Sequence, residues 1–353
     1  MEERADAKQI ARVVDNVCGV QAQVMSAAQI ALWARIKDIA PEDVENALWK
    51  EKSLVKTWCM RSTVHIVPSD YLSIYTGAVR RSMIKNEQSW IKRRGGNPDD
   101  TQEMINAIGG ALGHECITRK ELTEKVVVSL GEKARKWVGH GWGGIMKQAC
   151  LAGLVCFGPN RWQEITFVRC DSWLRKTTGA SVEKSENELM RRYLGSYGPA
   201  SLQDFSAWSG IPAGTAIEIL ENIENETSKV SVEGKEKIVL RKDLDDLESA
   251  DTVAPSVRLL PSFDSYMLGH RNKSHLVDEA HYKLVYRKAG WLSPVVLSNG
   301  RAIGTWSYEK KDKKLAVAVN LFEKTSAEAR KKIENEAANL GHFFNIDANT
   351  TFV

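Results

Sequence analysis

The sequence is poor in cysteine and lacks the cysteine and histidine spacings that typically hold zinc. It has six cysteines among 353 residues, and no two of them form a CxxC pair. We therefore expect no structural zinc site, and we expect reduced thiols in a cytoplasmic protein. The six residues are Cys18, Cys59, Cys116, Cys150, Cys156 and Cys170.

Long apolar runs and familiar catalytic motifs are also missing. Residues 17–34 come nearest to a membrane span, but they include Gln21, Gln23 and Gln29, and residues 1–6 are charged. No Walker loop, GxGxxG, HExxH or GxSxG motif occurs. A membrane protein, a nucleotide hydrolase and a zinc hydrolase are therefore unsupported, and we expect neither a metal nor a cofactor.

The charge is unevenly distributed, although the formal net charge is only +4. Residues 1–97 carry +4, residues 98–180 +2, residues 181–250 −6 and residues 251–353 +4. A composition of 43% hydrophobic and 27% charged residues is typical of a globular protein. The densest basic run is either a solvated helix face with a linker or a stripe that contacts phosphates. It comprises Arg80, Arg81, Lys85, Lys92, Arg93 and Arg94.

A pattern of two helices followed by a β-hairpin is clearest in residues 98–180. Thr118 and Glu121 form a capping-box pair before a helix to about Leu130, and a second helix contains apolar residues from 142 to 150, Trp142 included. Residues 154–157 and 165–168 are predicted strands joined by a turn at 158–160. This order is that of a winged helix-turn-helix.

The same pattern recurs on both sides of this segment. Ser201 and Asp204 start a helix, Pro212 opens the next, and strands at 230–232 and 238–240 flank a turn. Near the N-terminus, the pair Ser26 and Gln29 caps a helix to Arg35, Pro41 opens a helix to about Lys50, and residues 53–57 and 63–67 form a hairpin. Most of the tryptophans are predicted to lie in the core.

The C-terminal segment has a different pattern. Strands are predicted at 257–261, 295–297, 302–306 and 315–321, with an Asn-Gly turn at 299–300, and Thr325 and Glu328 cap a final helix to about Phe344. We therefore predict an α+β, mainly helical protein with three tandem winged-helix modules, at 1–97, 98–180 and 181–250, and an α/β cap at 251–353. Winged helices bind DNA or act as protein scaffolds, so this fold leaves function open.

The segment Gly19-Val20-Gln21-Ala22-Gln23 is the least ordinary part of the chain. Gln29 is assigned to the capping box, whereas Gln21 and Gln23 have no evident structural role. Two glutamines in apolar surroundings need hydrogen-bond partners if they are buried. They either satisfy backbone groups near a helix start or belong to a functional site.

Four stretches, in the same order, resemble the AlkZ-like winged-helix DNA glycosylases. Residues 19–23 resemble the GxQxQ signature, and LVKTWCMRSTVH at 54–65 resembles W-x-MRGTLH. LLPSFDSYMLG at 259–269 resembles LLPxFDxYLLG, and NGRAIGTW at 299–306 resembles the family's GTW hairpin. Ser62 stands where the family usually has glycine, so we expect the local turn to differ if the family requires a positive φ there.

The resemblance implies a function. Members of the family have three tandem winged helices in a C-shape around a DNA channel, excise alkylated purines and, in some cases, unhook interstrand crosslinks. Gln21 and Gln23 would be the active-site pair, and a sister group has aspartate at the position of Gln23. The implied partner is double-stranded DNA with alkylated bases, bound by a monomer. From the charge distribution we expect the DNA to lie against the first module, the middle module and the cap, with residues 181–250 turned away from it or acting as a brace.

Several basic and polar residues are candidates for DNA contacts. Arg61, Thr63 and His65 alternate on one predicted strand, although His65 is better explained as a salt-bridge partner or a hydrogen-bonded core histidine. Asp264 is interpreted as a helix cap rather than an acid. The remaining candidates for contacts with phosphates or a groove are Arg80, Arg81, Arg93, Arg94, Arg119, Lys120, Lys147 and Arg301.

Two other functions remain open at this point. One is a non-catalytic winged-helix DNA-binding protein such as a regulator, and the other is a protein-interaction scaffold. Three modules and a cap exceed what a simple regulator needs. Salt-dependent DNA binding would separate the first two functions from the scaffold, and base release from methylated DNA would separate a glycosylase from a regulator.

Overall fold

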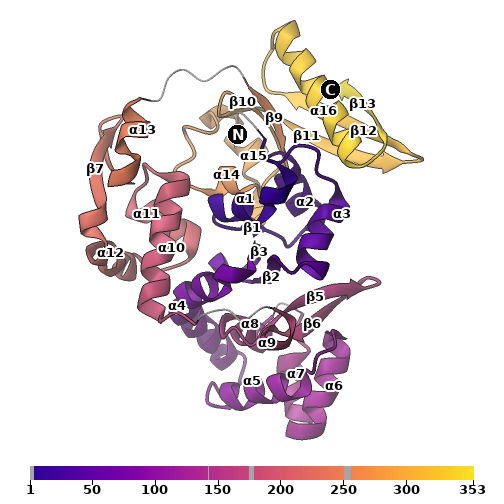
Figure 1. The fold of residues 1–353 in the computed structure, drawn as a ribbon, viewed down its shortest axis with the longest axis vertical. Coiled ribbons are helices and arrows are strands. Elements are labelled where there is room, and N and C mark those ends of the chain that lie inside the picture. Colours follow the sequence, from indigo (N-terminus) through magenta and orange to yellow (C-terminus); the bar gives the residue numbers. More distant parts are fainter. Residues whose placement is uncertain (1–3, 142, 175–178, 250–255) are drawn as a thin grey trace. The chain divides into compact units, whose positions relative to one another are not determined.

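The computed structural model describes residues 4–141, 143–174, 179–249 and 256–353 (Figure 1). The chain is an α+β protein in which about half of the residues are helical. It divides into two compact units, Met1–Glu45 with Asp243–Val353, and Asn46–Lys242. The four consecutive segments expected from the sequence remain a prediction. The first unit joins both ends of the chain because N-terminal residues pack on C-terminal ones, as in the ion pair of Arg4 with Glu336.

A five-stranded sheet forms the centre of the first unit, in the order β13-β12-β11-β10-β9. Its strands are β9 (Val257–Leu260), β10 (Val295–Ser298), β11 (Arg301–Lys311), β12 (Lys314–Leu321) and β13 (Asp347–Phe352). The predicted Asn-Gly turn joins β10 to β11, with positive φ at Asn299 and Gly300. Strand β13 pairs in parallel with β12 and was not predicted.

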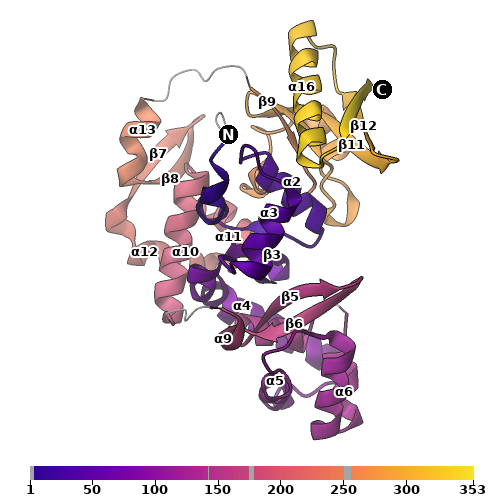
Figure 2. The same ribbon diagram turned by 45° about the vertical axis from the view of Figure 1, so that its right-hand side comes forward.

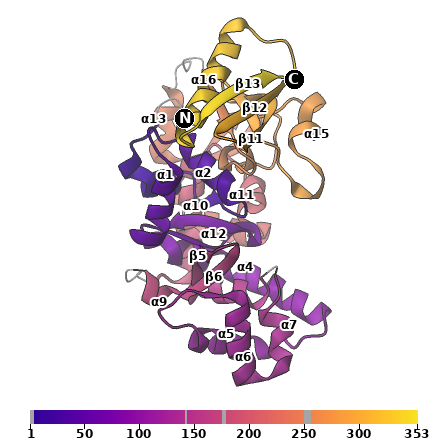
Figure 3. The ribbon, with the colours of Figure 1, turned by 90° about the vertical axis from the view of Figure 1, so that its right-hand side faces the viewer.

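Helices cover this sheet and form the N-terminal part of the first unit. The long helix α16 (Ala327–Phe343) packs on β9 and β13 and lies beside the sheet (Figures 2 and 3). Its N-cap is Ser326, one residue after the predicted Thr325, because the Ser326 hydroxyl accepts the Ala329 N–H. The other elements of this unit are α1 (Ile10–Asn16), β1 (Val20–Gln21), α2 (Met25–Trp33), α3 (Pro41–Glu45), α13 (Leu244–Glu248), α14 (Ser265–Leu268) and α15 (Tyr282–Val285).

The start of α2 differs from its prediction. Val24 is the N-cap residue and has no side-chain capping bond, so Ser26 lies in the first turn and is exposed. Gln29, predicted to complete a capping box with Ser26, is buried in the helix. Burial of the apolar residues that follow, from Ala27 to Trp33, places the helix, because packing outweighs a single capping bond.

The second unit begins with a hairpin and a long helix. Strands β2 (Leu54–Trp58) and β3 (Val64–Pro68) pair antiparallel, after a π-helical turn at Asn46–Lys50, and α4 (Leu72–Arg93) follows. Helices α5 (Asp100–Ala111), α6 (Arg119–Leu130), α7 (Arg135–Val138) and α8 (Ile145–Leu151) come next. The predicted capping box of Thr118 and Glu121 is present at the start of α6. Trp142 lies outside the described residues.

The hairpin after α8 is longer than predicted. Strand β5 (Val155–Arg161) continues through the expected turn at 158–160 and pairs with β6 (Glu164–Arg169), so the turn lies at Trp162 and Gln163. Pro159 is tolerated because β5 is an edge strand in the order β4-β6-β5, with β4 at Ile117–Thr118. The chain then forms the short helix α9 (Cys170–Trp173).

From Ser201 onward the last part of the second unit follows its prediction, whereas the helix before it was not predicted. Helix α10 (Val182–Tyr197) packs on α4, and α11 (Leu202–Ser209) starts at the predicted capping box of Ser201 and Asp204. Helix α12 (Ala213–Asn222) follows Pro212, and the hairpin of β7 (Thr227–Val232) and β8 (Lys235–Leu240) completes the unit. Among the described residues, no helix combines the length and the apolar character that a membrane span requires.

Serine occupies a left-handed conformation between β2 and β3. Ser62 has φ +57° and Arg61 has φ +55°. An L-residue in this conformation is disfavoured by about 1–2 kcal/mol, whereas glycine adopts it freely at a greater entropic cost in the unfolded chain. We expect Ser62→Gly to raise the free energy of unfolding by roughly 0.5–1 kcal/mol in urea denaturation. Ser62→Ala is the control, and a glycine variant no more stable than the alanine variant would contradict this explanation.

Candidate active site and nucleic-acid contacts

The backbone around Gly19-Val20-Gln21-Ala22-Gln23 is held from two sides within the first unit. Cys18 and Gly19 have positive φ values of 51° and 87°, and the Gly19 N–H donates to the Val14 carbonyl at 2.9 Å. The Ser265 hydroxyl donates to the Gly19 carbonyl at 3.1 Å. Glycine is the residue that adopts this left-handed bend without strain, which explains its place at the start of the motif.

The two glutamines contact each other. The Gln21 Nε2 donates to the Gln23 Oε1 at 3.1 Å. Gln21 is only 8% exposed, whereas Gln23 is exposed. The buried amide therefore orients the exposed one, whose neutral carbonyl oxygen accepts this bond and keeps a second lone pair for another donor.

A buried ion pair lies beside this motif. The Arg35 guanidinium donates through two nitrogens to Asp264, at 2.7 and 2.8 Å, and also to the Ala31 carbonyl. The side chains are 8% and 0% exposed. Asp264 also accepts the Tyr266 N–H at the start of α14, so its interpretation as a helix cap is confirmed, while its pairing with Arg35 was missed. The signal in the sequence that could have indicated this pair is Arg35, a charged residue directly after an apolar helix.

The GTW stretch, at the predicted hairpin of residues 299–306, contacts the strand that precedes Asp264. The Trp306 indole Nε1 donates to the Leu260 carbonyl at 2.8 Å, which ties the GTW stretch to the strand before Asp264. Three of the four stretches singled out in the sequence, at 19–23, 259–269 and 299–306, are thus joined by contacts within the first unit. The fourth, at 54–65, belongs to the second unit.

Arg61, Thr63 and His65 lie together in the second unit. The His65 Nδ1 is 3.1 Å from the Thr63 carbonyl and its Nε2 is 3.4 Å from the Arg61 guanidinium. The Arg61 guanidinium also donates to the Trp208 carbonyl. His65 is 2% exposed, and its burial beside Arg61 lowers the pKa of the imidazole to about 3. His65 is thus a neutral ring with a donor to Thr63 and an acceptor toward Arg61.

The buried neutral imidazole of His65 makes stability depend on pH. Its pKa is near 6.5 in an unfolded chain and about 3 in the folded protein. Between these values the unfolded state binds the extra proton, so this residue lowers the free energy of unfolding by about 1.4 kcal/mol for each unit of falling pH. We expect His65→Gln to flatten the pH dependence between pH 6.5 and 4 in chemical denaturation. Parallel curves for variant and wild type would contradict this assignment.

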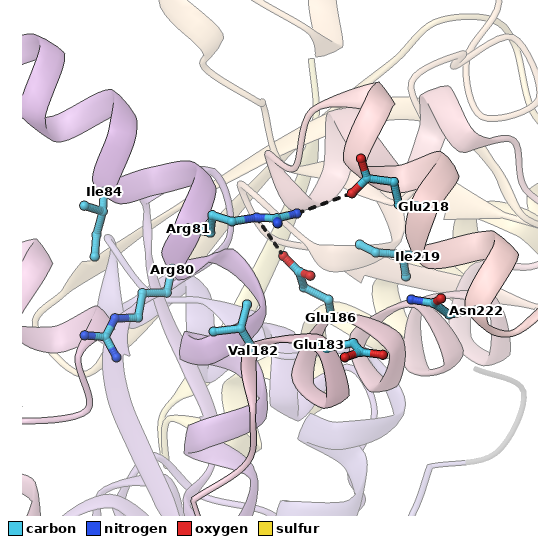
Figure 4. A pocket seen from close by; sticks show the side chains of 9 residues that line it. All are labelled: Arg80, Arg81, Ile84, Val182, Glu183, Glu186, Glu218, Ile219 and Asn222. Atoms are coloured by element: carbon cyan, nitrogen blue, oxygen red, sulfur yellow. Dashed lines mark ion pairs between the residues drawn. The ribbon is translucent and has the colours of Figure 1, made fainter.

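The basic run on α4 is partly neutralised by carboxylates. The Arg81 Nε lies 3.7 Å from Glu186 on α10, and an Arg81 terminal nitrogen lies 3.6 Å from Glu218 on α12. These residues line a pocket of about 650 Å³ in which the Arg80 side chain points away from both acids (Figure 4). Burial raises the pKa of the Glu186 carboxyl. Both arginines are exposed, but the two carboxylates beside Arg81 make it less suited to a phosphate contact than Arg80.

The other candidates fall into exposed and internally paired groups. Arg93, Arg94 and Lys120 are exposed, and the Arg94 guanidinium lies 4.5 Å from the centre of the Trp90 ring. Lys147 donates to Glu87 at 3.1 Å, and Arg119 donates to the His140 carbonyl at 3.0 Å. Arg301 donates to the His275 carbonyl at 3.3 Å and pairs with Asp278, with 45% of its side chain exposed.

Comparison with known proteins shows the family to which the chain belongs. A sequence model described as "DNA glycosylase AlkZ-like" matches residues 14–343. The chain is 32% identical over 340 residues to the "Interstrand DNA cross-link repair glycosylase" of Streptomyces sahachiroi, covering 93% of this chain and 89% of that protein. It superposes on the structure of Streptomyces sahachiroi DNA glycosylase AlkZ with a TM-score of 0.84 and 29% identity, covering 98% and 94% of the two chains.

The α+β fold, the joined motifs and these matches define a monofunctional DNA glycosylase, a hydrolase of N-glycosyl bonds. The chain belongs to the AlkZ-like DNA glycosylase family.

Proposed function

We propose that this enzyme hydrolyses the N-glycosidic bond of cationic alkylated purines in double-stranded DNA, and that interstrand crosslinks through such purines are also substrates. The observation that carries the proposal is the pair of Gln21 and Gln23, one buried and one exposed, joined by a 3.1 Å hydrogen bond. The S. sahachiroi relative is named for interstrand crosslink repair, and this supports the proposal that crosslinks are substrates here as well.

A neutral amide suits a substrate that is already activated. A purine alkylated at N7 or N3 carries a positive charge, so the bond from C1′ to N9 breaks with its electron pair moving onto the base, and no general acid is needed. The sugar gains oxocarbenium character, and water adds to C1′ and loses a proton to solvent. The Gln23 oxygen accepts a hydrogen bond from that water and places a partial negative charge near the cationic sugar.

The neighbouring carboxylate is poorly placed to act as the base. Asp264 has both oxygens bonded to Arg35, one of them also to the Tyr266 N–H, and no exposed side-chain surface. A carboxylate held in this way has no route to a substrate water. This favours positioning of water by Gln23, with Gln21 as the residue that orients it.

We further propose that exposed basic side chains bind the phosphates of the DNA backbone. Arg80, Arg93, Arg94 and Lys120 are exposed and none of them belongs to the acidic third segment, residues 181–250. Arg61, Thr63 and His65 form a second group, in which the half-buried Arg61 also donates to the Trp208 carbonyl and would contact DNA through its remaining N–H donors. Arg81, Arg119, Lys147 and Arg301 already have protein partners and would contribute to the field around the DNA rather than as free contacts.

The test is direct detection of released base. DNA containing 7-methylguanine is incubated with the enzyme, and free 7-methylguanine is measured together with the abasic strand. We expect base release without strand cleavage. Salt-dependent DNA binding without any base release would instead identify a non-catalytic DNA-binding protein. A crosslinked duplex assayed in parallel reports whether unhooking accompanies base release.

A further inference from the structure

Most of the tryptophans were expected in the core, and among the described ones Trp162 departs furthest from this, while Trp291 is also exposed at 48%. Trp162 is 95% exposed, whereas Trp33, Trp58, Trp208 and Trp306 are all buried. It lies at the turn of the hairpin formed by β5 and β6, which projects from its neighbouring helices (Figure 1). Aromatic side chains gain free energy when they are buried, so folding alone gives no reason for this placement.

The backbone at Trp162 is also unfavourable. Arg161 and Glu164 are paired across the hairpin, so Trp162 and Gln163 form a two-residue turn, and Trp162 has φ +60°. The hairpin turns at Glu233-Gly234, Asn299-Gly300 and Asp312-Lys313 place small or polar residues at their positive φ values. A bulky aromatic residue in this conformation is strained.

The hairpin that carries Trp162 is braced. The Arg161 guanidinium donates to Glu121 at 2.6 Å and to the Cys116 carbonyl at 2.8 Å. The Thr166 hydroxyl donates to the Pro159 carbonyl at 2.7 Å across the two strands. These contacts fix the base of the turn, so the indole is held out in solvent by a rigid support.

One basic residue, Arg161, directly precedes the exposed indole in the chain and is ion-paired with Glu121. Glu121 on α6, which contacts Arg161, directly follows the exposed Lys120 in the chain. Arg161 itself keeps 48% of its side chain exposed. An exposed aromatic side chain at a braced turn, next to a half-exposed arginine, matches the apolar wedges that enter a base step from the minor groove.

We propose that Trp162 inserts between base pairs of the bound duplex and locally unstacks them. The proposal rests on the proposed function, since it assigns a DNA contact to the same enzyme. Insertion buries the indole that folding leaves exposed, and the braced hairpin sets its position before DNA arrives. It gives the enzyme a means of distorting the duplex that does not involve the glutamine pair.

The experiment measures binding of the full-length protein to duplex DNA at several salt concentrations. Trp162→Gly removes the indole and relieves the backbone strain, Trp162→Asn removes the indole while tolerating the positive φ, and Trp162→Phe keeps an aromatic ring. We expect the first two to bind DNA about 10- to 100-fold more weakly and Trp162→Phe to stay within about threefold of wild type. Lys120→Ala is the matched control for a phosphate contact.

The salt dependence distinguishes insertion from charge. The slope of log Kd against log salt is expected to be unchanged in Trp162→Gly and reduced in Lys120→Ala, because only the lysine displaces counterions. Affinities of Trp162→Gly and Trp162→Asn within twofold of wild type would overturn the proposal. So would equal losses in Trp162→Phe and Trp162→Gly, or a change of oligomeric state with unaltered DNA binding. A wild-type protein that binds DNA but releases no base would refute the proposed function and leave insertion to be judged by these affinities.

Discussion

Replacing Gln23 by alanine is expected to slow release of 7-methylguanine by about 100- to 1,000-fold under single-turnover conditions, with little change in DNA affinity. Removing one preorganised group that stabilises developing charge typically has an effect of this size. Gln23 is exposed and its side chain bonds to the neighbouring Gln21, so we expect the fold to tolerate its loss. The measurement is the rate of base release at saturating enzyme, together with the Kd for the same duplex.

Gln21→Ala separates orientation from direct action. We expect a smaller loss than for Gln23→Ala, because the exposed amide remains but loses its 3.1 Å contact. The double variant should be little slower than Gln23→Ala, since residues that act as one unit are not additive. Gln29→Ala, in which a buried glutamine of the same region is removed, is the control for general disturbance. A double variant as fast as wild type would remove the glutamine pair from the mechanism.

Breaking the buried ion pair is expected to have the largest effect on stability. Asp264→Ala leaves Arg35 buried without its counter-charge and removes the cap of α14, so we expect a loss of about 3–5 kcal/mol in the free energy of unfolding. Both side chains are nearly inaccessible to solvent, and the two contacts are 2.7 and 2.8 Å long. Chemical denaturation with a probe for each compact unit measures the loss.

Replacing both partners of the ion pair tests whether the unpaired charge of Arg35 causes the loss of stability. Arg35→Met with Asp264→Ala removes both charges and should be more stable than Asp264→Ala alone, because no buried charge is left unpaired. Asp264→Asn retains an acceptor for the Tyr266 N–H and reports the cap separately. If the double variant is as unstable as the sum of the two single variants, the pairing energy is negligible and packing explains the loss.

Local signals predicted many of the elements. The capping boxes at Thr118 and Ser201 mark real helix starts, because each satisfies two backbone groups within a few residues. The Asn-Gly turn at 299–300 has the positive φ values that its residues favour. Such features depend on short-range chemistry that a single sequence contains.

The sequence-based predictions were wrong where tertiary packing determines the boundaries of helices and strands. Ser26 resembles a cap but lies inside α2, and the predicted turn at 158–160 is strand because an edge strand tolerates Pro159. Strand β13 follows the last helix and has few apolar residues, so its parallel pairing with β12 left no pattern in the sequence. Boundaries and long-range pairings of this kind depend on contacts between distant residues.

The candidate site was predicted through resemblance rather than through chemistry visible in the sequence. Spacing alone left Gln21 and Gln23 open to a structural role, and only their match to the family signature favoured catalysis. Arg35 was missed because its partner is 229 positions away. Among the basic residues, sequence could not separate the exposed Arg93 from Lys147, which donates to Glu87.

The most direct test of the account compares a cationic with a neutral purine in the same duplex. Single-turnover release of 7-methylguanine and of hypoxanthine is measured with wild-type enzyme. A glutamine pair that positions water, without a general acid, predicts rapid release of 7-methylguanine and release of hypoxanthine at the uncatalysed rate. Comparable rates for the two bases would require protonation of the leaving group and would contradict the proposed mechanism.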